Sequence, residues 1–255
     1  MSSFLFRGLV VLTAMLPGGS TPVLADTSHK LTIRWHGQSF FELETSKGTR
    51  IAIDPHAIEA YGRTDVTANL ILITHFHNDH DQKEVIRNYA RAKLIEGLKR
   101  GGKKLDWNPV DETFRDVHIQ TVGVYHDDVE GMERGKNAVF VLEADGLRIV
   151  HLGDLGHLLT PKQIKAIGPV DVLMIPVGGV YTINGADANQ VVEQLKPSRY
   201  IIPMHYGTRV YDDLLPADEF LEDQKNVKKF PSNKLTIETD LKLPEPIIAI
   251  LDWKN

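Results

Sequence analysis

The sequence predicts an α/β fold in which β-sheets are covered by helices. Short β-type segments separated by turns come first, and later segments mix strands with helices without strict alternation. No internal repeat or low-complexity linker divides the chain. A chain of 255 residues can bury a large core, because the buried fraction of surface rises with chain length. We therefore expect one α/β domain over residues 26–255, preceded by a separate N-terminal segment.

The first half of the chain predicts strands wherever short apolar segments are bounded by turns. The expected strands are Leu31 to Trp35, Ser39 to Leu43, Arg50 to Ile53 and Leu70 to Thr74. Ser46-Lys47-Gly48 predicts a hairpin turn. Phe40 and Phe41 are adjacent in one of these strands, so their side chains should point to opposite faces and at least one should join the core.

The middle of the chain predicts one helix and three more strands. Residues 83–98 are rich in Ala, Lys, Arg, Glu and Leu and end before Gly101-Gly102, which favours a helix. Strands are expected at Val117 to Val124, Asn137 to Glu143 and Leu147 to Leu152. Asp145-Gly146 indicates a tight hairpin between the last two.

The last third predicts strands alternating with short helices. Thr160 is suited to cap a helix that starts at Pro161 and runs to Ile167. The other expected helices are Ala186 to Leu195 and Ala217 to Lys225, and the expected strands are Val170 to Pro176, Tyr200 to Pro203, Lys234 to Glu238 and Ile247 to Leu251.

Composition excludes several classes of protein. The hydrophobic fraction of 42%, the charged fraction of 25% and the net charge of −5 are typical of a globular protein. A mildly acidic chain is a poor general nucleic-acid binder, since phosphate contacts need clustered Lys and Arg. The absence of cysteine excludes disulfides, thiolate metal ligands and a cysteine nucleophile.

Residues 1–25 are typical of a secretory signal peptide. Arg7 is followed by an apolar stretch from Gly8 to Leu16, a breaker at Pro17, and small residues ending at Ala25. The apolar stretch is too short to span a bilayer, which takes about 20 apolar residues. We expect cleavage after Ala25, a periplasmic or secreted mature protein, and no stable membrane span after removal of the signal.

Four candidate metal ligands fall within six positions directly after the apolar segment that ends at Thr74. They are His75, His77, Asp79 and His80, in the order His-x-His-x-Asp-His. Neutral imidazole binds zinc at about 2.0 to 2.1 Å, and a carboxylate offsets the charge of the ion. The alternative, a histidine-rich surface loop, explains less well why these groups gather at the end of a buried strand. The motif therefore predicts a metal site.

With this motif the sequence resembles the metallo-β-lactamase superfamily, over nearly all of the chain after the signal segment. Four further segments match the family in order: Ile53-Asp54-Pro55, Val124-Tyr125-His126-Asp127, Leu152-Gly153-Asp154 and Pro203-Met204-His205. The resemblance implies a four-layer αββα sandwich. It also implies two bound ions, which we expect to be Zn²⁺, with Mn²⁺ or Fe²⁺ as alternatives.

The resemblance implies a role for each of these residues. One ion would be held by His75, His77 and His126, the other by Asp79, His80 and His205, with Asp154 bridging both. Asp54 would orient a ligand histidine from behind. His118 is the rival of His126, but it alternates with apolar residues inside a strand and should face solvent.

The implied activity is that of a binuclear metal-dependent hydrolase acting on a small-molecule substrate. A metal-bridging hydroxide would attack an ester, lactone or phosphodiester bond. Asp79 is the expected proton shuttle, because one of its oxygens can face the attacking water while the other binds metal. Two alternatives remain open: a metal-dependent oxidoreductase of the persulfide dioxygenase type, and a non-catalytic exported metal-binding protein.

Some segments resemble one branch of the superfamily, which contains L-ascorbate-6-phosphate lactonase and N-acyl-phosphatidylethanolamine phospholipase D. These segments are Trp35-His36-Gly37, Pro176-Val177-Gly178-Gly179 and Pro203 to Thr208. Leu155 stands where lactonase relatives tend to have threonine, a departure that weakens the case for specificity toward phosphorylated sugars. His151, His157, Tyr181 and Tyr206 are further candidates for supporting the site or contacting substrate.

Overall fold

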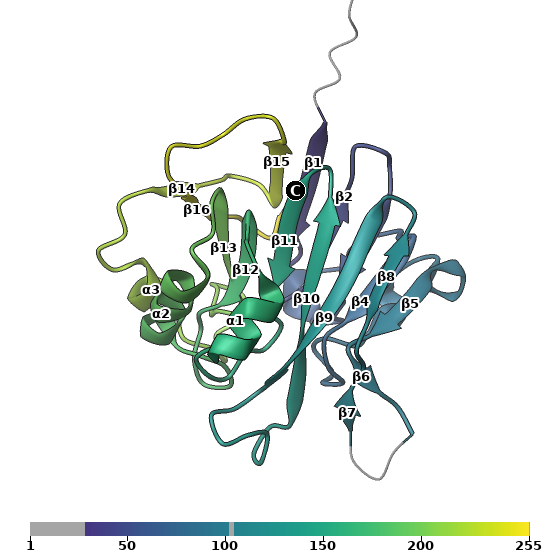
Figure 1. Ribbon diagram of the computed structural model, residues 1–255, viewed down its shortest axis with the longest axis horizontal. Coiled ribbons are helices and arrows are strands. Elements are labelled where there is room, and N and C mark those ends of the chain that lie inside the picture. Colours follow the sequence, from purple (N-terminus) through teal and green to yellow (C-terminus); the bar gives the residue numbers. More distant parts are fainter. Residues whose placement is uncertain (1–28, 102–104, 255) are drawn as a thin grey trace, which may run out of the picture.

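Two large β-sheets form the centre of the molecule (Figure 1). The computed structural model describes residues 29–101 and 105–254. Strand order is β15-β1-β2-β3-β4-β5 in the first sheet and β14-β16-β13-β12-β11-β10-β9-β8 in the second, and β6 and β7 form a small third sheet. The expected signal segment, residues 1–25, lies outside the described residues.

The first sheet is antiparallel at one side and parallel at the other. Its strands are β1 (Lys30–Trp35), β2 (Phe41–Glu44), β3 (Arg50–Ile53), β4 (Leu70–Ile73), β5 (Lys93–Glu96) and β15 (Lys234–Glu238). The strands β15, β1, β2 and β3 pair antiparallel, whereas β3, β4 and β5 are parallel. The parallel connections contain the 3-10 turns η1 (Glu59–Tyr61), η2 (Lys83–Val85) and η3 (Tyr89–Arg91).

The second sheet supplies most of the strands that end near the candidate site. Its strands are β8 (Asp111–Phe114), β9 (Val117–Tyr125), β10 (Lys136–Ala144), β11 (Leu147–His151), β12 (Val172–Pro176), β13 (Tyr200–Met204), β14 (Val227–Lys229) and β16 (Ile247–Ile250). Because β10 is antiparallel to both β9 and β11, and β12 and β13 follow in parallel, β9, β11 and β13 all run in the same direction. Their carboxyl ends therefore meet at one edge. The small sheet contains β6 (Leu98–Lys99) and β7 (Asp106–Trp107).

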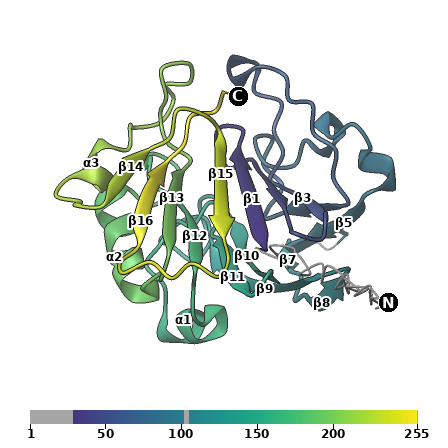
Figure 2. The same cartoon turned by 90° about the horizontal axis from the view of Figure 1, so that it is seen from above.

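Three α-helices lie on the side of the second sheet (Figures 1 and 2). They are α1 (Pro161–Ile167), α2 (Gly185–Leu195) and α3 (Asp218–Leu221). Their buried side chains belong to the main hydrophobic cluster of the molecule. The first sheet is covered on its outer face by loops and 3-10 turns, which enclose a smaller apolar cluster. The predicted α/β class, with β-sheets and covering helices, is confirmed, although the described outer layer over the first sheet lacks an α-helix. Among the described residues, no helix is long and apolar enough to cross a membrane.

Phe40 and Phe41 divide between the two cores. Both side chains are fully buried. Phe41 belongs to the main cluster between the sheets, and Phe40 belongs to the cluster on the outer face of the first sheet. The prediction that these neighbours point to opposite faces is confirmed, and both are core residues.

The predicted helix over residues 83–98 is wrong. The segment forms η2, η3 and then β5, which pairs with β4 from Leu70↔Lys93 to Ile73↔Glu96. Asn88 interrupts any helix because its side chain donates to the Ala68 carbonyl and accepts from the Ala68 N–H. Strand pairing thus overrides helix propensity, which is a weak local preference.

The predicted helix at Ala217 to Lys225 is correct only over α3, a single turn. Phe220 is its one buried side chain, so longer helix would have no apolar face to bury. Glu222 is already extended and Asp223 has a positive φ of 62°. The capped helix α1 is confirmed: Thr160 and Gln163 form a reciprocal capping box.

Candidate metal centre

Every predicted metal ligand follows the carboxyl end of a strand. His75, His77, Asp79 and His80 lie on the loop after β4, whereas His126, Asp154 and His205 follow β9, β11 and β13. The first sheet therefore contributes the histidine-rich loop, and the second contributes three single ligands from parallel strands. All seven side chains gather into two adjoining groups.

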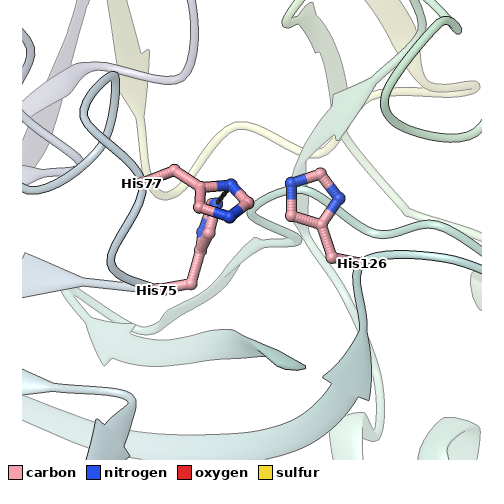
Figure 3. A group of neighbouring side chains, drawn as sticks. All are labelled: His75, His77 and His126. Carbon is pink, nitrogen blue, oxygen red and sulfur yellow. Dashed lines mark hydrogen bonds between the residues drawn. The ribbon is translucent and has the colours of Figure 1, made fainter. Parts of the chain in front are cut away.

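The first group consists of His75, His77 and His126, drawn in Figure 3. Their ligand atoms lie within 4.8 Å of one another, and His75 Nε2 is 3.1 Å from His77 Nδ1. His75 and His126 are buried, whereas His77 is exposed. The group therefore reaches solvent through His77.

The second group consists of Asp79, His80, Asp154 and His205. Asp79 Oδ2 lies 3.5 Å from His80 Nε2 and 3.9 Å from His205 Nε2. Asp79 retains 32% side-chain exposure, whereas the other three side chains are buried. Asp79 is thus the member of this group that incoming molecules can reach.

Asp154 lies between the two groups. Its Oδ2 atom is 3.1 Å from His126 Nε2 and 3.8 Å from His75 Nε2 in the first group. The same oxygen is 3.1 Å from His80 Nε2 and 3.2 Å from His205 Nε2 in the second. One carboxylate oxygen therefore faces four imidazole nitrogens.

These separations fit metal binding. Ligands bound at about 2.0 to 2.2 Å to a tetrahedral ion lie about 3.3 to 3.6 Å apart, close to most of the distances above. His80 Nε2 is buried and makes no hydrogen bond of acceptable geometry among the described residues, although Asp154 Oδ2 lies 3.1 Å away, while its Nδ1 lies 3.0 Å from Asp54 Oδ2. A buried nitrogen without a partner is costly unless an ion binds it. The donor set of imidazoles and carboxylates suits zinc and similar divalent ions.

The electrostatics of the cluster also favour a cation. Burial raises the pKa of Asp154, but the nearby imidazoles of His205 and His80 lower it by a larger amount. The net result is a pKa well below the usual value for aspartate. Burial likewise raises and His80 lowers the pKa of Asp79, with a net downward shift. For His80 itself, burial lowers the pKa and the two carboxylates raise it, with a net upward shift. The second group is thus a buried anionic site that draws positive charge.

Asp54 lies behind His80, as expected from the sequence. Its carboxylate accepts hydrogen bonds from the Thr74 N–H at 2.8 Å and the Thr74 hydroxyl at 2.7 Å, and it contacts His80 Nδ1. Thr74 Oγ1 is also 2.9 Å from His75 Nδ1. Asp54 can therefore fix the orientation of His80 directly and that of His75 through Thr74.

Two supporting residues were not predicted from the sequence. Gln38 Nε2 donates to Asp79 Oδ2 at 3.0 Å, and Ser39 Oγ donates to Asp154 Oδ1 at 3.4 Å. Both lie on the turn between β1 and β2, where Gly37 has a φ of 91° and the Tyr61 ring leaves no room for a side chain. The polar pair directly after Trp35-His36-Gly37 was the available signal.

The remaining histidines lie outside both groups. His118 contacts Asp111 and Thr113 near the start of β9 and is partly exposed, as expected. His151 is buried and lies 3.0 Å from the Ser39 carbonyl. His157 Nε2 accepts from the Tyr125 N–H, so it supports the backbone next to His126.

The two tyrosines singled out from the sequence differ. Tyr206 is buried and stacks on Trp35 at 5.3 Å, which is a packing role. Tyr181 is 47% exposed and lines a cavity of about 470 Å³ that also touches His126 and Arg134. A cavity of this size beside the candidate centre can hold a small molecule.

Known proteins match this chain over most of its length. A family model described as the beta-lactamase superfamily domain matches residues 32–205. A UPF0173 metal-dependent hydrolase of Thermococcus onnurineus is 33% identical over 193 residues, which cover 69% of this chain and 84% of the relative. Another, from Thermoplasma acidophilum, is 31% identical over 202 residues, covering 74% and 87%. A crystal structure of a superfamily member from Thermotoga maritima has a TM-score of 0.68 at 33% identity, covering 87% of this chain and 98% of that one.

The fold, the candidate ligand clusters at the strand ends and the similar proteins all indicate the same class of protein. This protein is a metal-dependent hydrolase. The chain belongs to the metallo-β-lactamase superfamily. The comparisons do not single out the lactonase branch that the sequence resembles.

Proposed function

We propose that this protein is a binuclear zinc-dependent hydrolase that attacks an ester, lactone or phosphodiester bond of a small molecule. The observation that carries the proposal is the position of Asp154 Oδ2, within 3.8 Å of imidazole nitrogens from both groups. In this proposal His75, His77 and His126 would hold one ion, Asp79, His80 and His205 would hold the other, and Asp154 would serve both. Zinc is favoured by the imidazole-rich donor set and by the Thermotoga maritima relative, for which zinc dependence has been proposed.

The bound ions would supply Lewis-acid activation of the scissile bond and of water. Asp79 is the residue that moves the proton in this proposal. Its carboxylate is ionised at neutral pH, and as a partly exposed group beside the second ligand set it would accept a proton from the attacking water. Its partial exposure lets it then pass that proton to the leaving group.

We further propose that the protein is exported. The composition of residues 1–25 supports a signal peptide that is cleaved after Ala25, leaving residues 26–255 as the hydrolase domain in the periplasm or outside the cell. Expression in a Gram-negative host with mass determination of the product tests this part. A full-length product that stays in the cytoplasm would contradict it.

The test of function is metal analysis followed by a hydrolysis panel. Mildly purified protein should contain about two zinc equivalents and hydrolyse at least one class among lactones, esters, thioesters and phosphodiesters. Asp79→Asn, assayed at zinc concentrations that restore full metal loading, should lower kcat by about 10²- to 10⁴-fold, the range typical of a lost general base. Iron with oxygen uptake would favour an oxidoreductase instead, and full metal loading without any hydrolysis would favour a binding protein.

A further inference from the structure

Gln38 is a buried polar residue beside the second ligand group. Its side chain is 1% exposed and lies on the turn between β1 and β2. Its backbone φ is 50°, a region that few residues other than glycine adopt. Backbone strain of this kind tends to persist at functional sites, where the surroundings hold it in place.

The Gln38 side chain contacts the oxygen of Asp79 that faces the histidines. Its amide Nε2 donates to Asp79 Oδ2 at 3.0 Å, and that same oxygen lies 3.5 Å from His80 Nε2. An amide donor does not titrate, so this hydrogen bond persists at every pH at which Asp79 is ionised. It holds this partly exposed carboxylate with Oδ2 toward His80 Nε2 and His205 Nε2, the side on which these residues would hold an ion.

The Gln38 backbone anchors a second member of the same group. Its carbonyl accepts hydrogen bonds from the His205 N–H at 3.1 Å and from Trp35 Nε1 at 2.9 Å. Among the described residues, Gln38 makes no hydrogen bond to His75, His77 or His126. One residue thus ties together two members of the second group and none of the first.

The turn itself does not depend on the Gln38 amide. Its backbone is closed by hydrogen bonds from the His36 N–H to the Phe40 carbonyl and from the Phe40 N–H to the Gly37 carbonyl. The bonds to His205 and Trp35 also use backbone atoms of Gln38, which a substitution retains. Replacing the side chain therefore removes the contact to Asp79 selectively. The Gln38 Oε1 atom, which is buried without a partner among the described residues, contributes no bond that would be lost.

We propose that Gln38 is a positioning residue that sets the metal affinity of the Asp79, His80 and His205 site. This rests on the proposed binuclear function. Residues that orient metal ligands typically change metal affinity by 10- to 100-fold when they are replaced. The effect should be confined to one of the two bound ions, because Gln38 contacts only one ligand group.

Stepwise metal binding tests the proposal. Apo wild type, Gln38→Met and Gln38→Asn are titrated with Zn²⁺ against a competing chelator, and with Co²⁺ while visible absorption is recorded. Met keeps the length of the side chain without the amide, and Asn keeps the amide but is one methylene shorter. Gln82→Met is the matched control, since Gln82 donates to Asn78 and Asp81 on the same loop and contacts none of the predicted ligands.

In both Gln38 variants one equivalent should bind about 10- to 100-fold more weakly with an altered cobalt spectrum, and the other should change by less than about threefold. Gln82→Met should match wild type. Unchanged binding of both equivalents, or equal weakening of both, overturns the proposal. A wild type that binds a single equivalent refutes the two-ion function. In that event, weakening of the single equivalent in the Gln38 variants still supports the role of Gln38, and unchanged binding overturns it.

Discussion

The two ligand groups of the candidate centre differ in charge, exposure and support. The first group contains three imidazoles, and His77 exposes it to solvent. The second holds two carboxylates, and three of its four members are buried. Gln38 donates to Asp79, which belongs to the second group alone, and Ser39 donates to Asp154, which lies between the groups. The second group is thus the anchored, anionic half of the site, and the first is its open half.

This difference indicates how the two halves divide the chemistry. A buried anionic pocket with oriented ligands binds a cation strongly. Open coordination, in contrast, leaves room for a substrate atom to approach. We therefore expect the second group to retain its ion more tightly, and the first to exchange ligands with substrate on the side of His77.

Asp154→Asn should have the largest effect on activity and metal content, because Asp154 lies between the two ligand groups. The substitution removes a negative charge from the position that faces four imidazole nitrogens. We expect kcat/KM to fall about 10³-fold or more, equivalent to about 4 kcal/mol, and bound zinc to fall below about two equivalents. Metal analysis and initial rates measure both effects.

The exposed Asp240→Asn provides the same chemical change far from the ligands and should behave as wild type. If Asp154→Asn kept two ions with normal affinity, a bridging role for Asp154 would be ruled out.

The scaffold behind the second group contains a buried histidine that should cost stability in acid. His56 is buried, and its Nε2 lies 3.2 Å from the carbonyl of Gly37, next to Gln38. Burial lowers the pKa of His56 to about 4, although the hydrogen bond to Gly37 opposes the shift. The unfolded chain, with a pKa near 6.5, therefore binds a proton that the folded state rejects, and stability falls as pH decreases from about 6.5 to about 4. The full loss from His56 is about 3 kcal/mol.

Urea unfolding of the apo protein at pH 7 and pH 4.5 measures this loss. His56→Asn does not titrate, and its side-chain oxygen can accept the Ile58 N–H that His56 Nδ1 accepts. The variant should lose about 2 to 3 kcal/mol less than wild type between the two pH values. Equal losses in the two proteins would show that His56 is already solvated in the folded state.

Asp54→Asn tests whether the contact of Asp54 with His80 makes the second group bind its ion more tightly than the first group does. Asparagine presents a donor where Asp54 accepts from His80 or Thr74. We expect the ion at the second group to bind about 10- to 100-fold more weakly, or about 1.4 to 2.7 kcal/mol. The ion at the first group should lose less, since Asp54 reaches His75 only through Thr74. Stepwise zinc titration distinguishes the two, and an equal effect on both would argue that the halves act as one unit.

The sequence predicted the candidate ligands at the strand ends because their signal is local. The segment from His75 to His80 directly follows the buried strand β4. His126 and His205 each come directly after the end of another strand. Local patterns also predicted the hairpin at Asp145-Gly146, helix α1 and strands β1 to β4, β9 to β13, β15 and β16, but not β5 to β8 or β14. That these segments meet at one edge depends on strand direction, which has no local signal, so the grouping of the ligands came from the family resemblance.

What the sequence did not show depends on tertiary contacts. The segment 83–98 is helical by composition, but its pairing with β4 has no local signature. Gln38 and Ser39 were missed because a polar turn between two strands is ordinary in sequence, and only the folded hairpin brings them to Asp79 and Asp154. Supporting residues are in general harder to predict than ligands, because their partners are distant in sequence.

His118→Ala should have the smallest effect and sharpens the assignment of His126. Both histidines belong to the β9 segment, but eight residues of extended strand separate them by about 26 Å. His118 lies 3.1 Å from the exposed Asp111, a surface contact worth less than about 1 kcal/mol. Its removal should leave zinc content and kcat/KM within about twofold of wild type, whereas His126→Ala should remove a ligand from the first group and weaken its ion. If His118→Ala lost metal and His126→Ala did not, the first group would be wrongly assembled, and the contrast between an open and an anchored half would lose its basis.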